Sequence, residues 1–301
     1  MKVGAEAMPT VASREKSRGG VWAELVKARL TSLVLLTTLV GFYMGTRGMV
    51  NYPLMLHTLL GTALLACGAA ALNQLIEREH DGLMRRTEGR PLPAGRVQPD
   101  TVLILGGVLA ASGMVYLALA VNALTGFLGA VTLGSYLFVY TPLKRVTTLN
   151  TAIGAIPGAL PPLMGWTAAR GEITSGGWSL FAILFFWQLP HFLAIAWMYR
   201  EDYARGGFQM LPVVDPDGSR TGRQAVSHTL GLLPVSLSPF LLKLAGEAYF
   251  FGALCVGCVF LWFAIRFARG LTLPRARQLF LVSILYLPVL LGLLVFDKIK
   301  H

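Results

Sequence analysis

Residues 54–93 read LMLHTLLGTALLACGAAALNQLIEREHDGLMRRTEGRPLP, a long apolar run that ends abruptly in charged residues. The apolar part is about 20 residues long and does not alternate with polar residues, which is typical of a membrane-spanning helix rather than a barrel strand. Its end carries Asn73, Glu77 and Asp81, so on a helix these three side chains lie along one face. We call this set the acidic ridge. Its amide and carboxylate oxygens are hard ligands that suit Mg²⁺.

Arginines follow the acidic ridge closely, at Arg78, Arg85, Arg86 and Arg90. Acidic oxygens backed by several guanidinium groups favour a site for a metal-bound polyphosphate, in which Mg²⁺ bridges carboxylates and phosphate oxygens. The alternative is a solvated helix end that merely stops a membrane span. We favour the polyphosphate site because the spacing, the arginines and the Pro-Leu-Pro stop occur together.

The composition is that of a polytopic membrane protein. Hydrophobic residues make up 54% and charged residues 14% of the 301 residues, with a mean hydropathy of +0.60, whereas soluble domains carry about 25% charged residues. We expect an all-α single bundle of nine transmembrane helices, with a central cavity and a cytoplasm-facing polar site. The expected spans are residues 22–46, 54–77, 101–121, 124–141, 149–168, 178–199, 228–246, 248–265 and 276–296. They form one transmembrane domain, 22–301, after a disordered basic N-terminus, 1–21.

The lysines and arginines fall mainly on one side of these expected spans. Of the 26, the exceptions are Arg47, Arg170, Lys243, Lys298 and Lys300. The positive-inside rule then predicts a multi-pass protein of the cell (inner) membrane with a cytoplasmic N-terminus and an outside C-terminus. The net charge of +11 therefore reports topology. The chain shows no pattern of a nucleic-acid-binding module, so we expect no nucleic acid among its partners.

A second polar segment, YREDYARGGFQMLP at residues 199–212, follows the sixth expected span. Its acids are Glu201 and Asp202, of which Asp202 could face the acidic ridge, with Tyr199 and Tyr203 beside it. Gly206 occupies the place where a second stacked carboxylate would lie. We therefore expect a smaller contribution to a metal site from this segment than from the acidic ridge.

His191 lies deeper in the sixth span, eleven residues before Asp202, so on a helix both point the same way. An ionisable side chain at this depth usually faces a cavity or the bundle interior. Two hypotheses stay open. His191 contacts a substrate such as a porphyrin, or it is a structural histidine bonded to a backbone carbonyl exposed near Pro190.

The segment YTPLKRVTTLN at residues 140–150 brings Tyr140, Lys144 and Arg145 to the same predicted face. The two cations either bind a diphosphate or anchor to anionic lipid head groups. The span that follows contains several prolines, so we expect it to be kinked or broken and to line a cavity.

Together these segments resemble the UbiA superfamily of intramembrane prenyltransferases. The resemblance rests on the N-x-x-x-E-x-x-x-D pattern of the acidic ridge, on MRRTEGRPLPAG at residues 84–95, on residues 140–150, and on PHFLAIAWMYREDYARGGFQMLP at residues 190–212. Two of these, the R-T-x-x-R-P-L-P continuation at residues 86–93 and the block at residues 190–212, look similar to the heme branch of the superfamily. That family usually has Asp where this chain has Glu77, and its wider superfamily has a second motif with two acids, of which only Asp202 is present here.

The resemblance implies a Mg²⁺-dependent prenyltransferase. Asn73, Glu77, Asp81 and Asp202 would be the catalytic and metal-binding residues. The substrate-binding residues would be Arg78, Arg85, Arg86, Arg90, Tyr140, Lys144, Arg145, His191, Tyr199 and Tyr203. In the heme branch, farnesyl diphosphate donates its chain to a vinyl group of heme B (protoheme IX), a substrate rather than a cofactor, and gives heme O and pyrophosphate. The bilayer, and heme A synthase or terminal-oxidase assembly factors, are the further partners it suggests.

Other functions remain open from the residues alone. A phenolic or quinone-precursor acceptor would use the same acidic ridge. A secondary transporter would concentrate its polar groups near the bilayer midplane, whereas here they gather at one cytoplasmic mouth. A heme-binding anchor would need paired axial ligands, and His191 is the only histidine placed deep in a polar-facing span.

Overall fold

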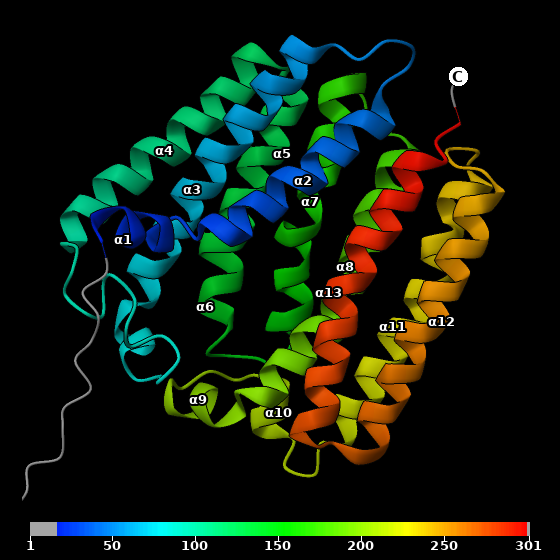
Figure 1. Cartoon of the computed structure of the whole chain (residues 1–301). Helices are drawn as coiled ribbons and strands as arrows, with labels where there is room; N and C mark the ends of the chain where they lie inside the picture. The colour runs from blue at the N-terminus through cyan, green and yellow to red at the C-terminus, as the bar shows by residue number, and fades with distance from the viewer. Residues whose placement is uncertain (1–16, 300–301) are drawn as a thin grey trace, which may run out of the picture.

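The computed structural model describes residues 17–299, which form a curved bundle of helices (Figure 1). The long elements are α2 (Ala28–Gly45), α3 (Tyr52–Gly82), α4 (Pro99–Ala120), α5 (Ala123–Gly134), α7 (Asn150–Arg170), α8 (Ser175–Met198), α11 (Ser219–Leu241), α12 (Glu247–Gly270) and α13 (Leu273–Phe296). Helix α5 continues into a π-helix, η1 (Ser135–Tyr140), and a last turn, α6 (Thr141–Leu143). The short helices are α1 (Arg18–Leu25), α9 (Arg200–Arg205) and α10 (Leu211–Val214). The predicted all-α polytopic class is confirmed.

The number of apolar spans differs from the prediction of nine. Seven helices within residues 17–299 are long and apolar enough to cross a membrane. The other two long helices, α7 and α11, occupy the places of the expected fifth and seventh spans but are less apolar. Helix α7 carries three prolines and is largely buried, while α11 starts nine residues earlier than expected and therefore includes Arg220 and Arg223.

The first expected span, 22–46, is wrong as a single helix. The chain forms α1 and α2, and Lys27 between them has a left-handed backbone with φ of 48°. The side chain of Lys27 turns inward to Asn73.

The sequence predicts that the N-terminal segment 1–21 is disordered. Its residues 1–16 lie outside the described residues, whereas residues 18–21 belong to α1.

Helix α7 is one continuous helix through Pro157, Pro161 and Pro162, so the expected break does not occur. The expectation that this span lines a cavity is confirmed, because two of these prolines, Pro157 and Pro161, face the central cavity. The expected spans 101–121 and 124–141 leave only two residues between them, and α4 and α5 are joined by such a short turn, in which the Asn122 side chain accepts a hydrogen bond of 2.8 Å from the Thr125 amide at the start of α5.

The two largest of the four apolar clusters among the described residues form most of the core of the bundle. The larger is built mainly from α8, α11, α12 and α13, and the smaller from α3, α4, α5 and α7. Helix α2 crosses between them and packs closely on α7, where Gly41 faces the Pro162 backbone and Gly165 faces the Thr38 backbone. Large apolar side chains such as Leu119 remain exposed on the outer surface, as a lipid-facing surface requires.

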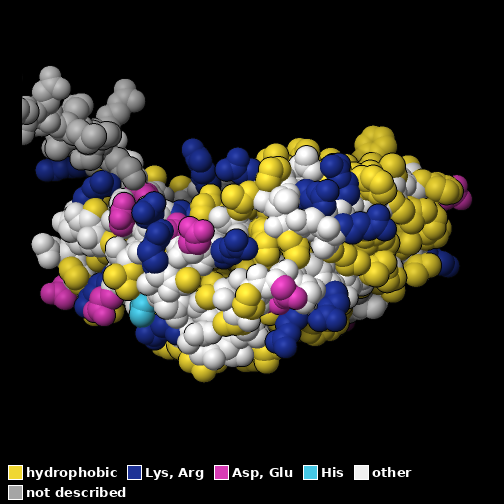
Figure 2. Space-filling view, turned by 90° about the horizontal axis from the view of Figure 1, so that it is seen from below, with side chains coloured by type: hydrophobic (Ala, Val, Ile, Leu, Met, Phe, Trp, Pro, Cys, Tyr) yellow, Lys and Arg dark blue, Asp and Glu magenta, His cyan; other side chains and the backbone are white. Residues whose placement is uncertain are grey.

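The charged residues gather at one end of the bundle. This end carries α9, α10 and the C-terminal end of α3 (Figure 1). Seen end-on, lysine, arginine, aspartate and glutamate side chains spread across it, while hydrophobic side chains gather toward one side (Figure 2). The bundle is therefore polar at the end where the acidic ridge lies.

The close approach of α2 and α7 yields a stability prediction. A methyl group at Gly165 would overlap the carbonyl oxygen of Thr38, so Gly165→Ala should destabilise the protein by about 1–3 kcal/mol through overpacking. The thermal unfolding midpoint of the protein purified in detergent measures this. Gly292→Ala is the control, because an added methyl group there meets no atom within 4 Å. Equal midpoints for the two variants would contradict the prediction.

Candidate active site at the polar end of the cavity

The acidic ridge forms one face of α3, as its spacing predicts. Asn73, Glu77 and Asp81 are all buried, and each has a cationic partner from another segment. Lys144 Nζ lies 2.6 Å from Glu77 Oε1, Arg90 Nη1 lies 2.5 Å from Asp81 Oδ2, and Lys27 Nζ donates to Asn73 Oδ1 at 2.7 Å. Buried carboxylates of this kind need such partners, because an unpaired charge loses its hydration.

Lys27 is a site residue that the sequence interpretation missed. Its ammonium group donates to Asn73 and lies 3.4 Å from the Tyr136 hydroxyl. Burial, with repulsion from the Arg90 guanidinium, lowers the pKa of Lys27 to about 7. The signal was present in the sequence, because a lysine inside an expected apolar span is itself an indication of function.

Lys144 follows the π-helix and the short α6, a local irregularity of the kind often found at functional sites. Its Nζ lies 4.5 Å from the centre of the Tyr140 ring. Burial opposes the charged form, but Tyr140 and the Glu77 carboxylate outweigh it and raise the pKa of Lys144. Thr141 in α6 accepts a hydrogen bond of 3.1 Å from Asn73 Nδ2, so α6 and the lysine that follows it each contact the ridge at one point.

Arg86 joins the loop after α3 to the second polar segment. Its Nη2 donates to the Tyr203 hydroxyl at 3.2 Å, and its guanidinium carbon lies 5.1 Å from the Tyr199 ring centre and 5.5 Å from that of Tyr203. The two tyrosines therefore position Arg86 through cation–π contacts.

A cavity of about 420 Å³ runs from this cationic end into the bundle. Lys27, Arg86 and Lys144 line its polar end, together with Tyr136 and Tyr140. Apolar residues from α2, α3, α7, α8 and α13 form most of its wall, and His191 lines it as well. A volume of this size lies in the range of small-molecule sites, about 300–1,000 Å³. The arrangement suits a ligand with an anionic head and an apolar body.

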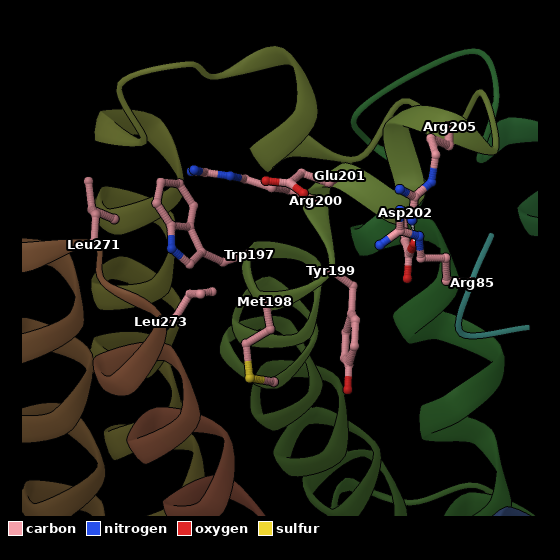
Figure 3. A pocket seen from close by; sticks show the side chains of 10 residues that line it. All are labelled: Arg85, Trp197, Met198, Tyr199, Arg200, Glu201, Asp202, Arg205, Leu271 and Leu273. Carbon is pink, nitrogen blue, oxygen red and sulfur yellow. Dashed lines mark hydrogen bonds and ion pairs between the residues drawn. The ribbon is translucent and has the colours of Figure 1, made fainter. Parts of the chain in front are cut away.

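The remaining predicted residues lie outside this cavity. Asp202 forms an ion pair with Arg205, and with Arg85 it lines a separate pocket beside α9 and the start of α13 (Figure 3). The Arg145 guanidinium lies 2.8 Å from a ring nitrogen of His80. Arg78 pairs with exposed Glu79 at 3.7 Å. Within residues 17–299, no three His, Cys, Asp or Glu side chains come close enough together to hold a metal ion.

Comparison with known proteins identifies the family. Residues 34–287 match the model of the UbiA prenyltransferase family. The chain belongs to this family. Among similar proteins, one named protoheme IX farnesyltransferase from Solibacter usitatus is 50% identical over 92% of this chain and 98% of its own length. A protein of the same name from Myxococcus xanthus is 44% identical over the whole of both chains.

Solved structures of UbiA homologues share the fold. A structure described as digeranylgeranylglyceryl phosphate synthase has a TM-score of 0.78 with 14% sequence identity, covering 92% of this chain and 97% of its own. A UbiA homologue from Archaeoglobus fulgidus, bound to GPP and Mg²⁺, has a TM-score of 0.64 with 16% identity, covering 91% and 99%. At these identities the likeness supports the fold of the prenyltransferase family and not the choice of substrate.

The Glu77–Lys144 pair yields a prediction for this member of the prenyltransferase family. Lys144→Met leaves the buried Glu77 carboxylate without its partner, which costs about 3–5 kcal/mol for a fully buried pair and less at a cavity mouth. Adding Glu77→Gln should restore part of the lost stability. Thermal unfolding of both single variants and the double variant gives the coupling, expected between about 0.5 and 3 kcal/mol. Strictly additive effects would show that the pair is not coupled.

Proposed function

We propose that this protein transfers the farnesyl group of farnesyl diphosphate to a vinyl group of heme B and releases pyrophosphate, giving heme O. The observation that supports the proposal is the cavity that joins a cationic mouth to an apolar interior. A prenyl diphosphate has this shape and charge. Family membership supports the reaction type, and relatives named protoheme IX farnesyltransferase that match over nearly the whole chain support the acceptor.

The cations at the mouth act on the leaving group. Lys27, Arg86 and Lys144 line the polar end of the cavity, where they would bind the diphosphate and stabilise the negative charge that develops as the carbon–oxygen bond breaks. Lys144 stays protonated, because its pKa is raised. Arg90, held on Asp81, adds positive charge beside the ridge.

The residues of the acidic ridge fit a Mg²⁺ ion. Asp81 Oδ1 is buried and has no hydrogen-bond partner among the described residues, which is the condition of an oxygen available to a cation. Asn73, Glu77 and Asp81 would hold the ion, whereas Asp202, paired with Arg205 at the separate pocket, lies apart from this set. Bound by the ridge, Mg²⁺ would supply Lewis-acid stabilisation of the departing pyrophosphate.

The apolar wall protects the reacting carbon. Loss of pyrophosphate leaves cationic character on the farnesyl chain, which water would capture unless it is excluded. The heme vinyl group instead adds to this carbon, and the positive charge moves to the vinyl carbon next to the porphyrin. One water then adds there and loses a proton, so the product carries a hydroxyethylfarnesyl chain. The prenyl chain and water enter heme O, and pyrophosphate and one proton leave.

The membrane orientation and partners are part of the proposal. The concentration of lysine and arginine at the end that holds the acidic ridge supports an N-terminus and an active site on the cytoplasmic side of the cell (inner) membrane. The C-terminus would then lie outside.

We propose heme A synthase or terminal-oxidase assembly factors as recipients of the product. A phenolic or quinone-precursor acceptor and a transport function are not favoured, given the names of the similar proteins.

A product assay tests the proposal. The purified protein is incubated with heme B and farnesyl diphosphate, with and without Mg²⁺, and products are separated by chromatography and weighed by mass spectrometry. We expect a Mg²⁺-dependent product heavier than heme B by one farnesyl group and one water. Transfer to a phenolic acceptor alone would keep the prenyltransferase and exclude heme as acceptor.

Asp81→Asn tests the acidic ridge within the same assay. The substitution removes a buried charge beside Arg90 and the Asp81 oxygen that lacks a partner. We expect loss of at least a hundredfold in kcat with the protein still folded in the membrane fraction. Glu79→Gln is the matched control, because it removes one carboxylate from the same helix at an exposed position. Full activity of Asp81→Asn would refute a role in binding the diphosphate or its metal.

A further inference from the structure

The ring of His191 is held rigidly in the wall of the cavity. It stacks between Trp187 and Phe280, with both ring centroids 5.1 Å away. Its Nδ1 lies 2.7 Å from the hydroxyl oxygen of Ser283 on α13. The partner is therefore a side chain from a neighbouring helix, and not a carbonyl near Pro190, which was the structural alternative. Three contacts from two helices fix both the position and the plane of the ring.

Ser283 also determines which nitrogen of His191 carries the proton. The Ser283 hydroxyl donates its only proton to the carbonyl oxygen of Phe280 at 2.6 Å. Its oxygen can therefore only accept from His191, so Nδ1 is the protonated nitrogen and Nε2 keeps a lone pair. Ser283 is itself fixed, because it is fully buried and its carbonyl accepts from Trp187 Nε1 at 2.8 Å.

The Nε2 lone pair is available to a ligand in the cavity. His191 is half-buried and lines the cavity, and the ring makes no other hydrogen bond within residues 17–299. Histidines that bind a metal commonly donate their second N–H to a neighbouring group, which fixes the tautomer and raises the basicity of the ligating nitrogen. His191 and Ser283 form this arrangement. They are separate from the acidic ridge, which is the proposed Mg²⁺ site.

We propose that His191 Nε2 is the axial ligand of the heme iron and positions the acceptor heme in the cavity. This rests on the proposed function, in which heme B is the acceptor. The lone pair forms a coordinate bond to iron and displaces a weakly held water or chloride, with no transfer of electrons. Proximal histidines bind heme iron through the same neutral imidazole in other proteins.

The depth of His191 agrees with this role. It lies seven residues before the end of α8 at Met198, or about 10 Å along the helix at 1.5 Å per residue. The cationic mouth binds the diphosphate near the polar end, and the prenyl chain lies along the apolar wall below it. Iron held at His191 places the porphyrin edge inside the same cavity, where a vinyl group can meet the prenyl chain.

The test uses the full chain, without a polyhistidine tag, purified in detergent and titrated with ferric heme B in the absence of prenyl diphosphate. Absorption in the Soret region and electron paramagnetic resonance report the axial ligand. We expect a nitrogen-ligated spectrum for the wild type. His191→Ala should lose it and raise the dissociation constant at least tenfold, and added imidazole should restore the spectrum. Ser283→Ala, which leaves the tautomer free, should weaken binding severalfold.

His228→Ala is the matched control, because His228 is also a half-buried helix histidine but does not line the cavity. It should leave the spectrum and affinity unchanged. If His191→Ala does not fold, His191→Met should give a sulfur-ligated spectrum instead. Identical spectra and affinities for the wild type and the His191 variants would overturn the ligand assignment. If the wild type makes heme O although its heme spectrum does not depend on His191, only the ligand assignment is wrong and the proposed function stands. If the wild type neither binds heme nor forms heme O, the proposed function is wrong as well.

Discussion

The structure depends on neutralising a buried row of oxygens. Glu77 and Asp81 lie on the inner face of α3, nearly inaccessible to solvent, where a carboxylate without a partner would be several kcal/mol unfavourable. Each has a cationic partner outside α3: Lys144, which is distant in the sequence, pairs with Glu77, and Arg90 from the loop after α3 pairs with Asp81. The same cations form the mouth of the cavity or lie beside it. The need to stabilise the acidic ridge thus places positive charge where an anionic substrate head would bind.

This constraint explains the irregular parts of the bundle. Lys27 reaches the ridge because the backbone turns left-handed between α1 and α2, which interrupts an otherwise continuous apolar span. Lys144 reaches it from a short turn after a π-helix. The two departures from regular geometry are small local costs that the Lys27–Asn73 hydrogen bond and the Lys144–Glu77 ion pair offset.

The sequence predicted the elements whose signal is local. Hydropathy predicts the all-α class and the short turn at Asn122. The 3.6-residue period of a helix predicts that the acidic ridge lies on one face. It did not predict the break at Lys27, because the sequence interpretation joins the end of the short helix α1 and the start of α2 in one apolar run. It also could not show that Asp202 lies at a separate pocket, since that depends on how α9 packs. Hydrogen-bond partners across helices, such as Ser283 for His191, leave no pattern in a single sequence.

The cavity combines two requirements that oppose each other. Stabilising a leaving pyrophosphate needs a polar mouth, whereas the cationic prenyl chain needs a dry interior. The fold separates them along α8 and α3, with charges at the helix ends and apolar side chains along the wall. His191 is an exception within that wall, and its neutral, fixed tautomer adds a lone pair without adding a charge. A polar group of this kind can bind an acceptor deep in the bundle without drawing in the water that the rest of the wall excludes.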